Sequence, residues 1–338
     1  MELNGKLIDL HVHLDGSLSI DTVKRLAAIQ GINISDIAKD DIALLSKLQV
    51  SKGCRDLNEY LEKFDFPLML MQTSAALEES IYALLKEQKE QGLIYSEIRF
   101  APQLHMKNGL SQKEVVEAIL KGRRKAKADF DMDCGIILCC MRGADNRLNE
   151  DTLYVAADML KAHKSIVAVD LAGAEKLFLT SDYEQLFSQA KELGLPFTIH
   201  AGEADGPESI WNALEFGASR IGHGIRAVED ESLMKELARR QIPLELCPTS
   251  NLNTKVSDSI EEYPIMKLIN AGVKVTINTD NMTVSGTTLA GELMMVKNAF
   301  MLSDEYILKL LVNSADAVFP NPDMENEFKA KLIDKILQ

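Results

Sequence analysis

The sequence predicts an α/β protein, a (β/α)8 TIM-type barrel that forms a single domain over residues 1–338. Three observations favour this fold. Short apolar runs typical of buried strands alternate with helix-like segments, and parallel strands need such crossover helices. Eight such runs are present, and α/β barrels commonly exceed about 200 residues as one domain. Polar residues follow several of the runs, where barrels of this type carry their active sites.

In chain order, the expected strands cover residues 7–11, 94–100, 134–140, 167–171, 197–200, 220–222, 243–247 and 274–278. The first is followed by Leu14-Asp15-Gly16-Ser17-Leu18, which lacks the glycine-rich pattern of an open doubly wound sheet. Residues 19–93 have room for several helices and contain no clear strand. We therefore expect a helical insertion after the first strand, over the active-site face, and extra helices at the C-terminus.

Local signals predict where several helices begin and end. Ser111-Gln112-Lys113-Glu114 has the spacing of a capping box, which opens a helix towards residue 129. A second helix is expected to open at Ser181 and to close at Gly194. Asp205-Gly206-Pro207 predicts a capped start with a first-turn proline for a third helix, which Gly217 would end.

Composition and charge limit the classes of function. The chain is 46% hydrophobic, enough for a large core, and its formal net charge is −14. Nucleic-acid binding requires clustered Lys and Arg, so this charge disfavours a nucleic-acid partner. No run approaches the roughly 18 apolar residues of a membrane span. The first residues lack the features of a signal peptide, and five cysteines without paired spacing fit reduced thiols, with Cys139-Cys140 in the core. We expect a cytoplasmic protein without a membrane partner.

Histidines and an aspartate lie at the ends of three predicted strands. His11-Val12-His13 ends the first, His200 the fifth, and Asp280 follows the eighth. Side chains two residues apart on a strand point to one face, so His11 and His13 can reach the same ion. Three imidazoles and a carboxylate suit zinc or a similar first-row metal. Each residue alone has an ordinary structural explanation, a helix cap for Asp280 for instance, but the joint pattern predicts a metal-dependent hydrolase.

Two further residues lie where a hydrolytic mechanism needs them. Glu203 is in the loop after the fifth strand, where it can face the cavity without binding the metal, and His223 ends the sixth strand. A bound divalent metal makes hydroxide available near neutral pH. His223 would take a proton from the attacking water or stabilise the developing oxyanion, and Asp280 would both bind the metal and orient the water. A protonated Glu203 would donate to a substrate nitrogen, which fits removal of ammonia from an aromatic amidine.

Seven motifs together resemble the adenosine deaminase family, in the same order and over essentially the whole chain. They are His11-Val12-His13-Leu14-Asp15-Gly16-Ser17-Leu18, Glu97-Ile98-Arg99-Phe100-Ala101-Pro102-Gln103, Asp170-Leu171-Ala172-Gly173-Ala174-Glu175, His200-Ala201-Gly202-Glu203, Gly222-His223-Gly224, Cys247-Pro248-Thr249-Ser250-Asn251 and Asn278-Thr279-Asp280. The resemblance implies a barrel with one zinc ion per chain. It also implies that the substrate is a small purine nucleoside, and that adenosine or 2′-deoxyadenosine is deaminated to the inosine product and ammonia in purine salvage.

The resemblance also implies roles for individual residues. The zinc ligands would be His11, His13, His200 and Asp280. Glu203 would protonate the purine nitrogen N1, and His223 would assist the attacking water. The backbone amide of Gly173 would lie near N3, Asp15 would contact ribose hydroxyls, and Tyr60, Leu61 and Phe64 would form part of an apolar lid over the pocket.

One position departs from the family pattern. Asn281 stands where the family usually has a second aspartate, which meets purine N7. The amide NH2 of asparagine can still donate to N7, so purine recognition is chemically preserved. Adenine deaminases usually carry Glu at the position of Asp15, and the shorter Asp15 leaves more room for a sugar. Deamination of adenine or of a 5′-modified adenosine remains the alternative.

Other classes fit the sequence less well. A dinuclear amidohydrolase needs a bridging lysine or carboxylate at the end of the fourth strand, and Val169-Asp170-Leu171-Ala172-Gly173 holds no lysine there, so one metal is expected. Zinc deaminases with a Cys-x-x-Cys signature are excluded, because this spacing does not occur. A non-catalytic barrel would be expected to have lost a ligand or the proton donor, and none is lost. His105 and His163 lack the strand-end context, so we expect solvated or structural roles for both.

Overall fold

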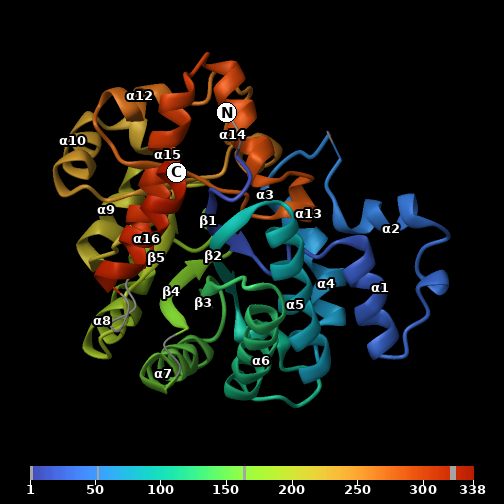
Figure 1. Cartoon of the computed structure of the whole chain (residues 1–338). Helices are drawn as coiled ribbons and strands as arrows, with labels where there is room; N and C mark the ends of the chain where they lie inside the picture. Colours follow the sequence, from blue (N-terminus) through green and yellow to red (C-terminus); the bar gives the residue numbers. More distant parts are fainter. Residues whose placement is uncertain (1–2, 52, 163–164, 320–324) are drawn as a thin grey trace.

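The computed structural model describes residues 3–51, 53–162, 165–319 and 325–338, and these form parallel strands surrounded by helices (Figure 1). Within them, eight strands make two four-stranded parallel sheets, in the orders β1-β2-β3-β4 and β5-β6-β7-β8. The strands are β1 (Leu7–His13), β2 (Leu93–Phe100), β3 (Cys134–Met141), β4 (Ile166–Ala172), β5 (Thr198–Ala201), β6 (Arg220–His223), β7 (Leu244–Leu246) and β8 (Val275–Ile277).

Each of the eight expected strands is confirmed, with limits that differ from the expectation by at most 2 residues. The largest difference is at β1, which continues to His13 because its pairing with β2 extends to the pair His13 and Arg99. Both histidines of the His-x-His motif therefore lie within β1, whose register against β2 shifts between Asp9 and Val12. Their side chains share a face, as the two-residue period requires.

Isolated parallel bridges connect the edges of the two sheets. Val12 in β1 is bridged to Asp280, and Val169 in β4 is bridged to Phe197, one residue before β5. At the first bridge, the amide of His13 donates to the Asp280 carbonyl and the amide of Asp280 donates to the His11 carbonyl, both at 2.7 Å. The end of β1 is thereby held against the residue that carries the predicted carboxylate ligand.

Helices connect the strands, and several lie between β1 and β2, where the sequence predicts no strand. These are α1 (Ile20–Ile29), η1 (Ile34–Asp36), α2 (Asp41–Leu48), α3 (Leu57–Leu61), η2 (Glu62–Phe64), α4 (Asp65–Leu70) and α5 (Ser74–Glu90). The later elements are η3 (Pro102–His105), α6 (Gln112–Phe130), α7 (Asn146–Ala162), η4 (Thr180–Tyr183), α8 (Glu184–Glu192), α9 (Pro207–Phe216), η5 (Ile225–Glu229), α10 (Glu231–Arg240), α11 (Pro248–Asn253), α12 (Ile265–Asn270), α13 (Met282–Ser285), α14 (Leu289–Ala299), α15 (Asp304–Ala317) and α16 (Glu325–Leu337).

The helix-end signals were confirmed in part. Ser111 and Glu114 form the expected reciprocal capping box at the start of α6. Gly194 follows the end of α8 with a positive φ of 72°. The start expected at Ser181 is wrong, because a short 3-10 turn, η4, occupies that position and α8 begins at Glu184 without a side-chain cap.

The predictions for the ends of α9 are also confirmed only in part. Pro207 is its first residue and Gly217 ends it in the left-handed conformation, as predicted. Asp205 does not cap the helix, because the N-cap is Gly206 and makes no side-chain hydrogen bond. The backbone amide of Asp205 is instead directed to the carboxylate of Glu175.

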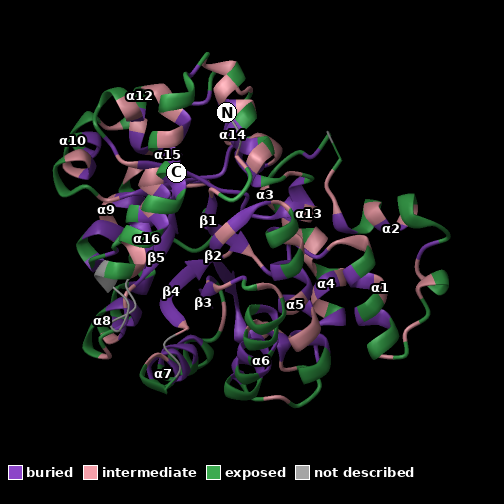
Figure 2. Cartoon of the chain, viewed as in Figure 1, coloured by how far each residue is buried: buried purple, intermediate pink, exposed green. Residues whose placement is uncertain are grey.

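The core lies in and around the strands, which are buried almost throughout, while the outer faces of the surrounding helices are exposed (Figure 2). All seven residues of β4 are buried, as expected for a parallel strand covered on both faces. The five cysteines are buried and free, and the predicted core position of Cys139 and Cys140 is confirmed. Among the described residues, no helix is long and apolar enough to cross a membrane.

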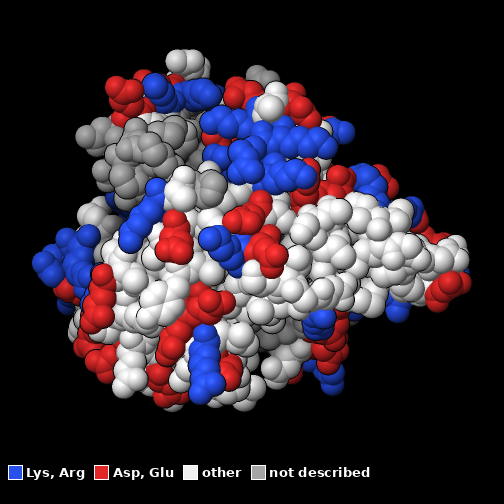
Figure 3. Space-filling view, turned by 90° about the horizontal axis from the view of Figure 1, so that it is seen from below, with Lys and Arg blue, Asp and Glu red and all other residues white. Residues whose placement is uncertain are grey.

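The surface carries charges of both signs. On the face in Figure 3, Lys and Arg side chains gather in one patch, with acidic side chains around them and elsewhere on this face. Basic side chains therefore gather locally on this face although the formal net charge of the chain is −14.

Candidate active site

A cavity of about 320 Å³ is lined by residues at or just beyond the carboxyl ends of strands from both sheets. All the predicted site residues except His11 line this cavity. They are His13, Asp15, Leu61, Phe64, Gly173, His200, Glu203, His223, Asp280 and Asn281. His11 is fully buried and contacts His200 from inside the sheet.

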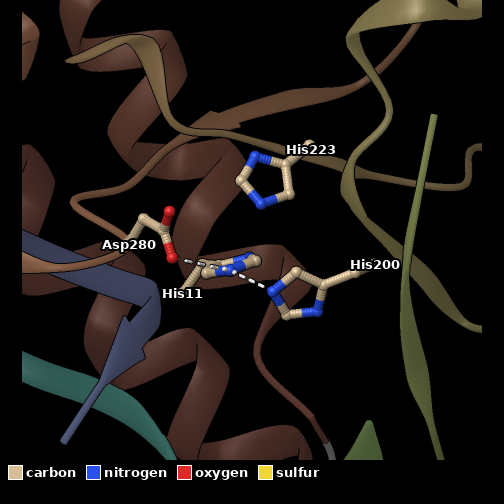
Figure 4. A group of neighbouring side chains, drawn as sticks. All are labelled: His11, His200, His223 and Asp280. Atoms are coloured by element: carbon tan, nitrogen blue, oxygen red, sulfur yellow. Dashed lines mark hydrogen bonds and ion pairs between the residues drawn. The ribbon is translucent and has the colours of Figure 1, made fainter. Parts of the chain in front are cut away.

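The predicted metal ligands meet at one point. The Nε2 atom of His200 lies 3.0 Å from Nε2 of His11 and 3.2 Å from Nε2 of His13. The Oδ1 atom of Asp280 lies 3.5 Å and 3.4 Å from the same two histidine nitrogens. Figure 4 shows His11, His200 and Asp280 directed towards one another, with the ring of His223 beside them. The structure thus brings together residues that are separated by up to 269 positions in the chain.

Buried carboxylates determine which ring nitrogens face this point. Nδ1 of His11 lies 2.7 Å from Oε2 of Glu245, and Nδ1 of His200 lies 2.9 Å from Oδ2 of Asp170. A neutral imidazole that donates through Nδ1 keeps a lone pair on Nε2. Two such acceptor nitrogens then face each other at 3.0 Å, which is unfavourable unless one ring is protonated or both nitrogens bind a cation. The donor set therefore fits a bound metal ion.

Burial keeps three of the histidines in the neutral form that a metal requires. It holds the pKa of His13 and of His223 well below the usual range, and it lowers the pKa of His200. His11 is the exception. Burial and the Arg99 guanidinium lower its pKa, but hydrogen bonds to carboxylates outweigh them and the net direction is upward.

Two site residues that are not glycine have a left-handed backbone. The φ angle is 58° at His223 and 59° at Asp280. Such a conformation is unfavourable for residues with a Cβ atom and persists where the surrounding structure enforces it, commonly at functional sites. At Asp280 the two backbone hydrogen bonds to β1 enforce it, so the carboxylate is directed by the neighbouring sheet edge.

Glu203 and His223 form a second cluster at the cavity. Oε2 of Glu203 lies 3.6 Å from Nε2 of His223, and Glu203 is 6% exposed. Burial, followed by the charges of Asp280 and Glu175, raises the pKa of Glu203 well above its usual range, so the surroundings favour the protonated carboxyl. As expected, Glu203 faces the cavity and is not part of the group of possible metal ligands. That group contains His11, His200, His223 and Asp280, so the geometry includes His223 and leaves out His13.

His223 is oriented by a chain of hydrogen bonds from beyond β7. The side-chain Nδ2 of Asn251 lies 3.1 Å from Nδ1 of His223, and the hydroxyl of Tyr263 donates to Oδ1 of Asn251 at 2.9 Å. Asn251 therefore donates to Nδ1. In a neutral ring this leaves the proton on Nε2, the nitrogen that faces Glu203.

Asp15 and Gly173 lie in the cavity wall. Oδ1 of Asp15 is buried without a hydrogen-bond partner, and burial raises the pKa of this carboxyl to about 6. Gly173 has a positive φ of 109°, a conformation that glycine adopts without strain. Asp15 therefore retains a free acceptor inside the cavity.

Asn281 packs tightly against the loop that follows β1. A Cβ atom at Gly16 would lie 1.8 Å from Oδ1 of Asn281, so glycine is required there. This oxygen is buried and has no hydrogen-bond partner. Because Oδ1 faces Gly16, the Nδ2 donor is the polar atom of Asn281 that remains for the cavity.

Helices α3 to α4 supply apolar side chains to the cavity. Leu61 and Phe64 line it together with Tyr60, whose hydroxyl lies 2.7 Å from Oγ of Ser285. His105, by contrast, is fully buried away from the cavity, and its Nδ1 lies 3.0 Å from the Met71 carbonyl oxygen. The structural role expected for His105 is confirmed, while His163 lies outside the described residues.

Sequence reasoning gave no roles to the buried residues that support the site. Asp170, Glu175 and Asn251 fall within the motifs quoted above, but their partners are distant in the chain. Arg99 joins two of the supporting carboxylates, since it donates to Asp170 at 2.9 Å and to Glu245 at 2.8 Å. The available signal was the presence of charged residues inside otherwise apolar strands.

Comparisons with known proteins agree with this geometry. A family model described as adenosine deaminase matches residues 7–338. A protein named adenosine deaminase from Haemophilus ducreyi is 46% identical over 335 residues, covering 98% of this chain and 96% of that protein. Among solved structures, an adenine deaminase from Arthrobacter aurescens has a TM-score of 0.87 at 25% identity, with 98% of each chain covered. An Arabidopsis N6-mAMP deaminase has a TM-score of 0.85 at 26% identity, with 99% of each chain covered.

Proposed function

The chain belongs to the adenosine deaminase family, and from this premise we propose that it hydrolyses adenosine and 2′-deoxyadenosine, releasing ammonia, in purine salvage. One observation carries the proposal. Three imidazole nitrogens and a carboxylate oxygen converge at a single cavity, beside the buried carboxyl of Glu203, whose pKa is raised well above its usual range. This arrangement provides a metal site and a proton donor within reach of one bound ring.

The proposed metal ligands are His11, His13, His200 and Asp280, which would hold one zinc ion per chain. When bound, such a metal supplies the Lewis acidity that makes hydroxide available near neutral pH. Imidazole and carboxylate donors suit zinc, and the carboxylates behind His11 and His200 support the tautomer that metal binding requires.

Proton transfer would be divided among the residues around the cavity. Glu203 donates a proton to purine N1, which makes C6 more electrophilic. Asp280 orients the attacking water. The hydrogen bond from Asn251 favours a proton on Nε2 of His223, so of its two expected roles we favour stabilisation of the developing oxyanion over removal of a proton. The oxygen of the attacking water bonds to C6, and one proton of this water passes to the amino nitrogen. The C6–N6 bond then breaks and ammonia leaves, while the proton of the new C6 hydroxyl returns to the Glu203 carboxylate and the C6 carbonyl of the product forms.

Substrate recognition would use Asp15 and Asn281, which line the cavity. Oδ1 of Asp15 has no hydrogen-bond partner in the protein and would accept from a ribose hydroxyl, and the side-chain NH2 of Asn281 would donate to N7. The amide of Gly173 would lie near N3, and Leu61 and Phe64 would cover the ring. We further propose that the two sheets close into one (β/α)8 barrel domain over residues 1–338, supported by the bridges at Val12 and Val169.

The remaining expectations about this protein are also proposals. We propose a cytoplasmic enzyme whose partner is its small-molecule substrate, with neither nucleic acid nor membrane bound. The helical segment between β1 and β2 is proposed to act as the lid of the pocket, because residues of α3 and η2 line the cavity.

Ammonia release from a substrate panel tests the proposal. The panel contains adenosine, 2′-deoxyadenosine, a 5′-modified adenosine, adenine and AMP. The two unmodified nucleosides should be the best substrates, and AMP should be poor because the Asp15 carboxylate would repel a phosphate. A preference for adenine would instead support the adenine deaminase alternative, which the A. aurescens neighbour favours. A preference for a 5′-modified nucleoside would support the other alternative.

A further inference from the structure

A single buried carboxylate, that of Glu175, holds the loop that carries Glu203. Four consecutive amide N–H groups of residues 202–205 donate to it. One reaches Oε1 at 2.6 Å, and three reach Oε2 at 2.7–3.0 Å. The hydroxyl of Ser209 donates to Oε1 at 2.5 Å. Glu175 is 1% exposed, so water does not compete for these donors. Hydrogen bonds to an ionised acceptor are stronger than neutral ones, and five meet here.

The same carboxylate connects two walls of the cavity. Glu175 follows β4 by three positions, and the intervening Gly173 lines the cavity. The loop that it holds follows β5 and turns at Gly202, whose φ is 67°. Without an acceptor, four adjacent and largely buried N–H groups would lose their partner, and the loop would have to move to find others.

A chain of polar contacts extends from this carboxylate to the backbone of a predicted ligand. Ser209 Oγ lies 2.7 Å from Oγ1 of Thr180, to which Arg142 donates at 2.9 Å. The same nitrogen of Arg142 donates to the His200 carbonyl at 2.7 Å. The backbone around β5 is therefore held at His200 by Arg142 and beyond it by Glu175. Of these two, Glu175 bonds directly to the amide of Glu203.

We propose that Glu175 is a positioning residue that sets the place of the Glu203 carboxyl against the purine ring. The proposal rests on the proposed function, in which Glu203 protonates N1. A displacement of about 1 Å in a reacting group can reduce turnover by about 10²-fold. Because Glu175 contacts backbone and Ser209 rather than the imidazole rings, its removal should affect proton transfer and leave metal binding nearly unchanged.

The test is a double-mutant cycle of Glu175→Gln and Glu203→Gln. Gln at position 175 offers one acceptor oxygen and sets its own NH2 against amide donors, so the loop should shift. We expect Glu175→Gln alone to lower kcat by roughly 10- to 100-fold. KM and metal affinity, measured by competition with a chelator, should change by less than about 3-fold. The double variant should have a kcat less than about 3-fold below that of Glu203→Gln alone, because Glu175 acts through Glu203.

Glu114→Gln is the matched control. This substitution removes the same charge from a carboxylate that accepts a backbone amide, that of Ser111 at the start of α6, and Glu114 does not line the cavity. Its turnover should be unchanged. If Glu175→Gln fails to fold, Ser209→Ala removes one of the five donors and should show the same dependence on Glu203 with a smaller loss.

The outcomes separate the inference from the proposed function. Losses that multiply in the double variant, or a comparable loss of metal affinity in Glu175→Gln, would overturn the positioning role. A Glu203→Gln variant with wild-type turnover would overturn the proposed function itself. Both the positioning role and the proposed function are supported if Glu203→Gln loses activity and the double variant has a kcat close to that of Glu203→Gln alone.

Discussion

The two sheets differ in how they present site residues. Strands of the first sheet have 7 or 8 residues, and those of the second have 3 or 4. The first sheet contributes His11 within β1 and His13 as its last residue. The second contributes His200 within β5, His223 at the end of β6, and Asp280 beyond β8, the last two with a left-handed backbone.

This difference bears on two tasks of the site, metal binding and proton transfer. The predicted metal ligands come from both sheets, so metal binding depends on how the sheets meet at Val12 and Asp280. The proposed proton donor and oxyanion donor, Glu203 and His223, both follow strands of the second sheet. Changes to the predicted ligands of either sheet should therefore remove the metal. Loss of proton transfer with the metal retained should arise at Glu203, or at Glu175 beyond β4, which holds the Glu203 loop.

The largest effect is expected when a histidine is removed from either sheet. His13→Ala removes a ligand from β1 and His200→Ala removes one from β5, and each should lose both the metal and essentially all turnover. Metal content measured on purified protein, together with ammonia release, checks this. Retention of a full complement of metal and activity in either variant would show that the metal is not shared between the sheets.

The next largest effect separates the two tasks within the second sheet. Glu203→Gln should keep the metal and lose roughly 10²- to 10⁴-fold in kcat, because Gln cannot transfer a proton. The measurements are metal content and kcat of the same preparation. If the variant lost its metal, Glu203 would be a ligand and the division between the sheets would be wrong.

The comparison also explains what sequence could and could not predict. The apolar pattern located the eight strands, and the period of two placed His11 and His13 on one face. Capping at Ser111 was predictable because all its partners lie within four residues. The roles of Asp170, Glu245 and Asn251 were not, because their contacts to His200, His11 and His223 join residues 28 or more positions apart.

Turns near the site show the same limit. Asp205 has the sequence of a helix cap, but the buried carboxylate of Glu175 takes up its amide and those of its neighbours. The long-range partner overrides the local preference. Likewise, the left-handed backbone at Asp280 results from hydrogen bonds to β1, a strand near the start of the sequence and therefore distant from Asp280 along the chain.

A smaller effect is expected at Asn281, which follows the second sheet and is proposed to recognise the substrate. If its NH2 donates to N7, 7-deazaadenosine should be about 5- to 150-fold poorer than adenosine, the equivalent of roughly 1–3 kcal/mol for an unmet buried donor. Asn281→Ala should lower adenosine turnover, and this variant should turn over adenosine and 7-deazaadenosine at nearly the same rate. An unchanged ratio of the two substrates in this variant would remove Asn281 from substrate recognition.

The smallest effect on turnover is expected at Glu292, a buried carboxylate of α14 beside the second sheet. Glu292 accepts from the amide of Thr249 and the hydroxyl of Thr287, without the arginine that accompanies Asp170 and Glu245. Burial raises its pKa to about 7. The folded protein therefore binds more protons at this group than the unfolded chain does, between the usual pKa of 4.5 and about 7. Its contribution to stability is present below pH 4.5 and is lost as the pH rises through about 7.

Glu292→Gln removes this titration and keeps an acceptor for the Thr249 amide. Its stability relative to wild type should rise across that pH window by about 1–3 kcal/mol and level off above it. Denaturant unfolding at several pH values measures the difference, and ammonia release at pH 7 should be unchanged. A stability difference independent of pH would show that Glu292 is ionised in the folded protein. The second sheet would then tolerate a buried, ionised carboxylate that has no arginine partner. Asp170 and Glu245, in contrast, both form ion pairs with Arg99.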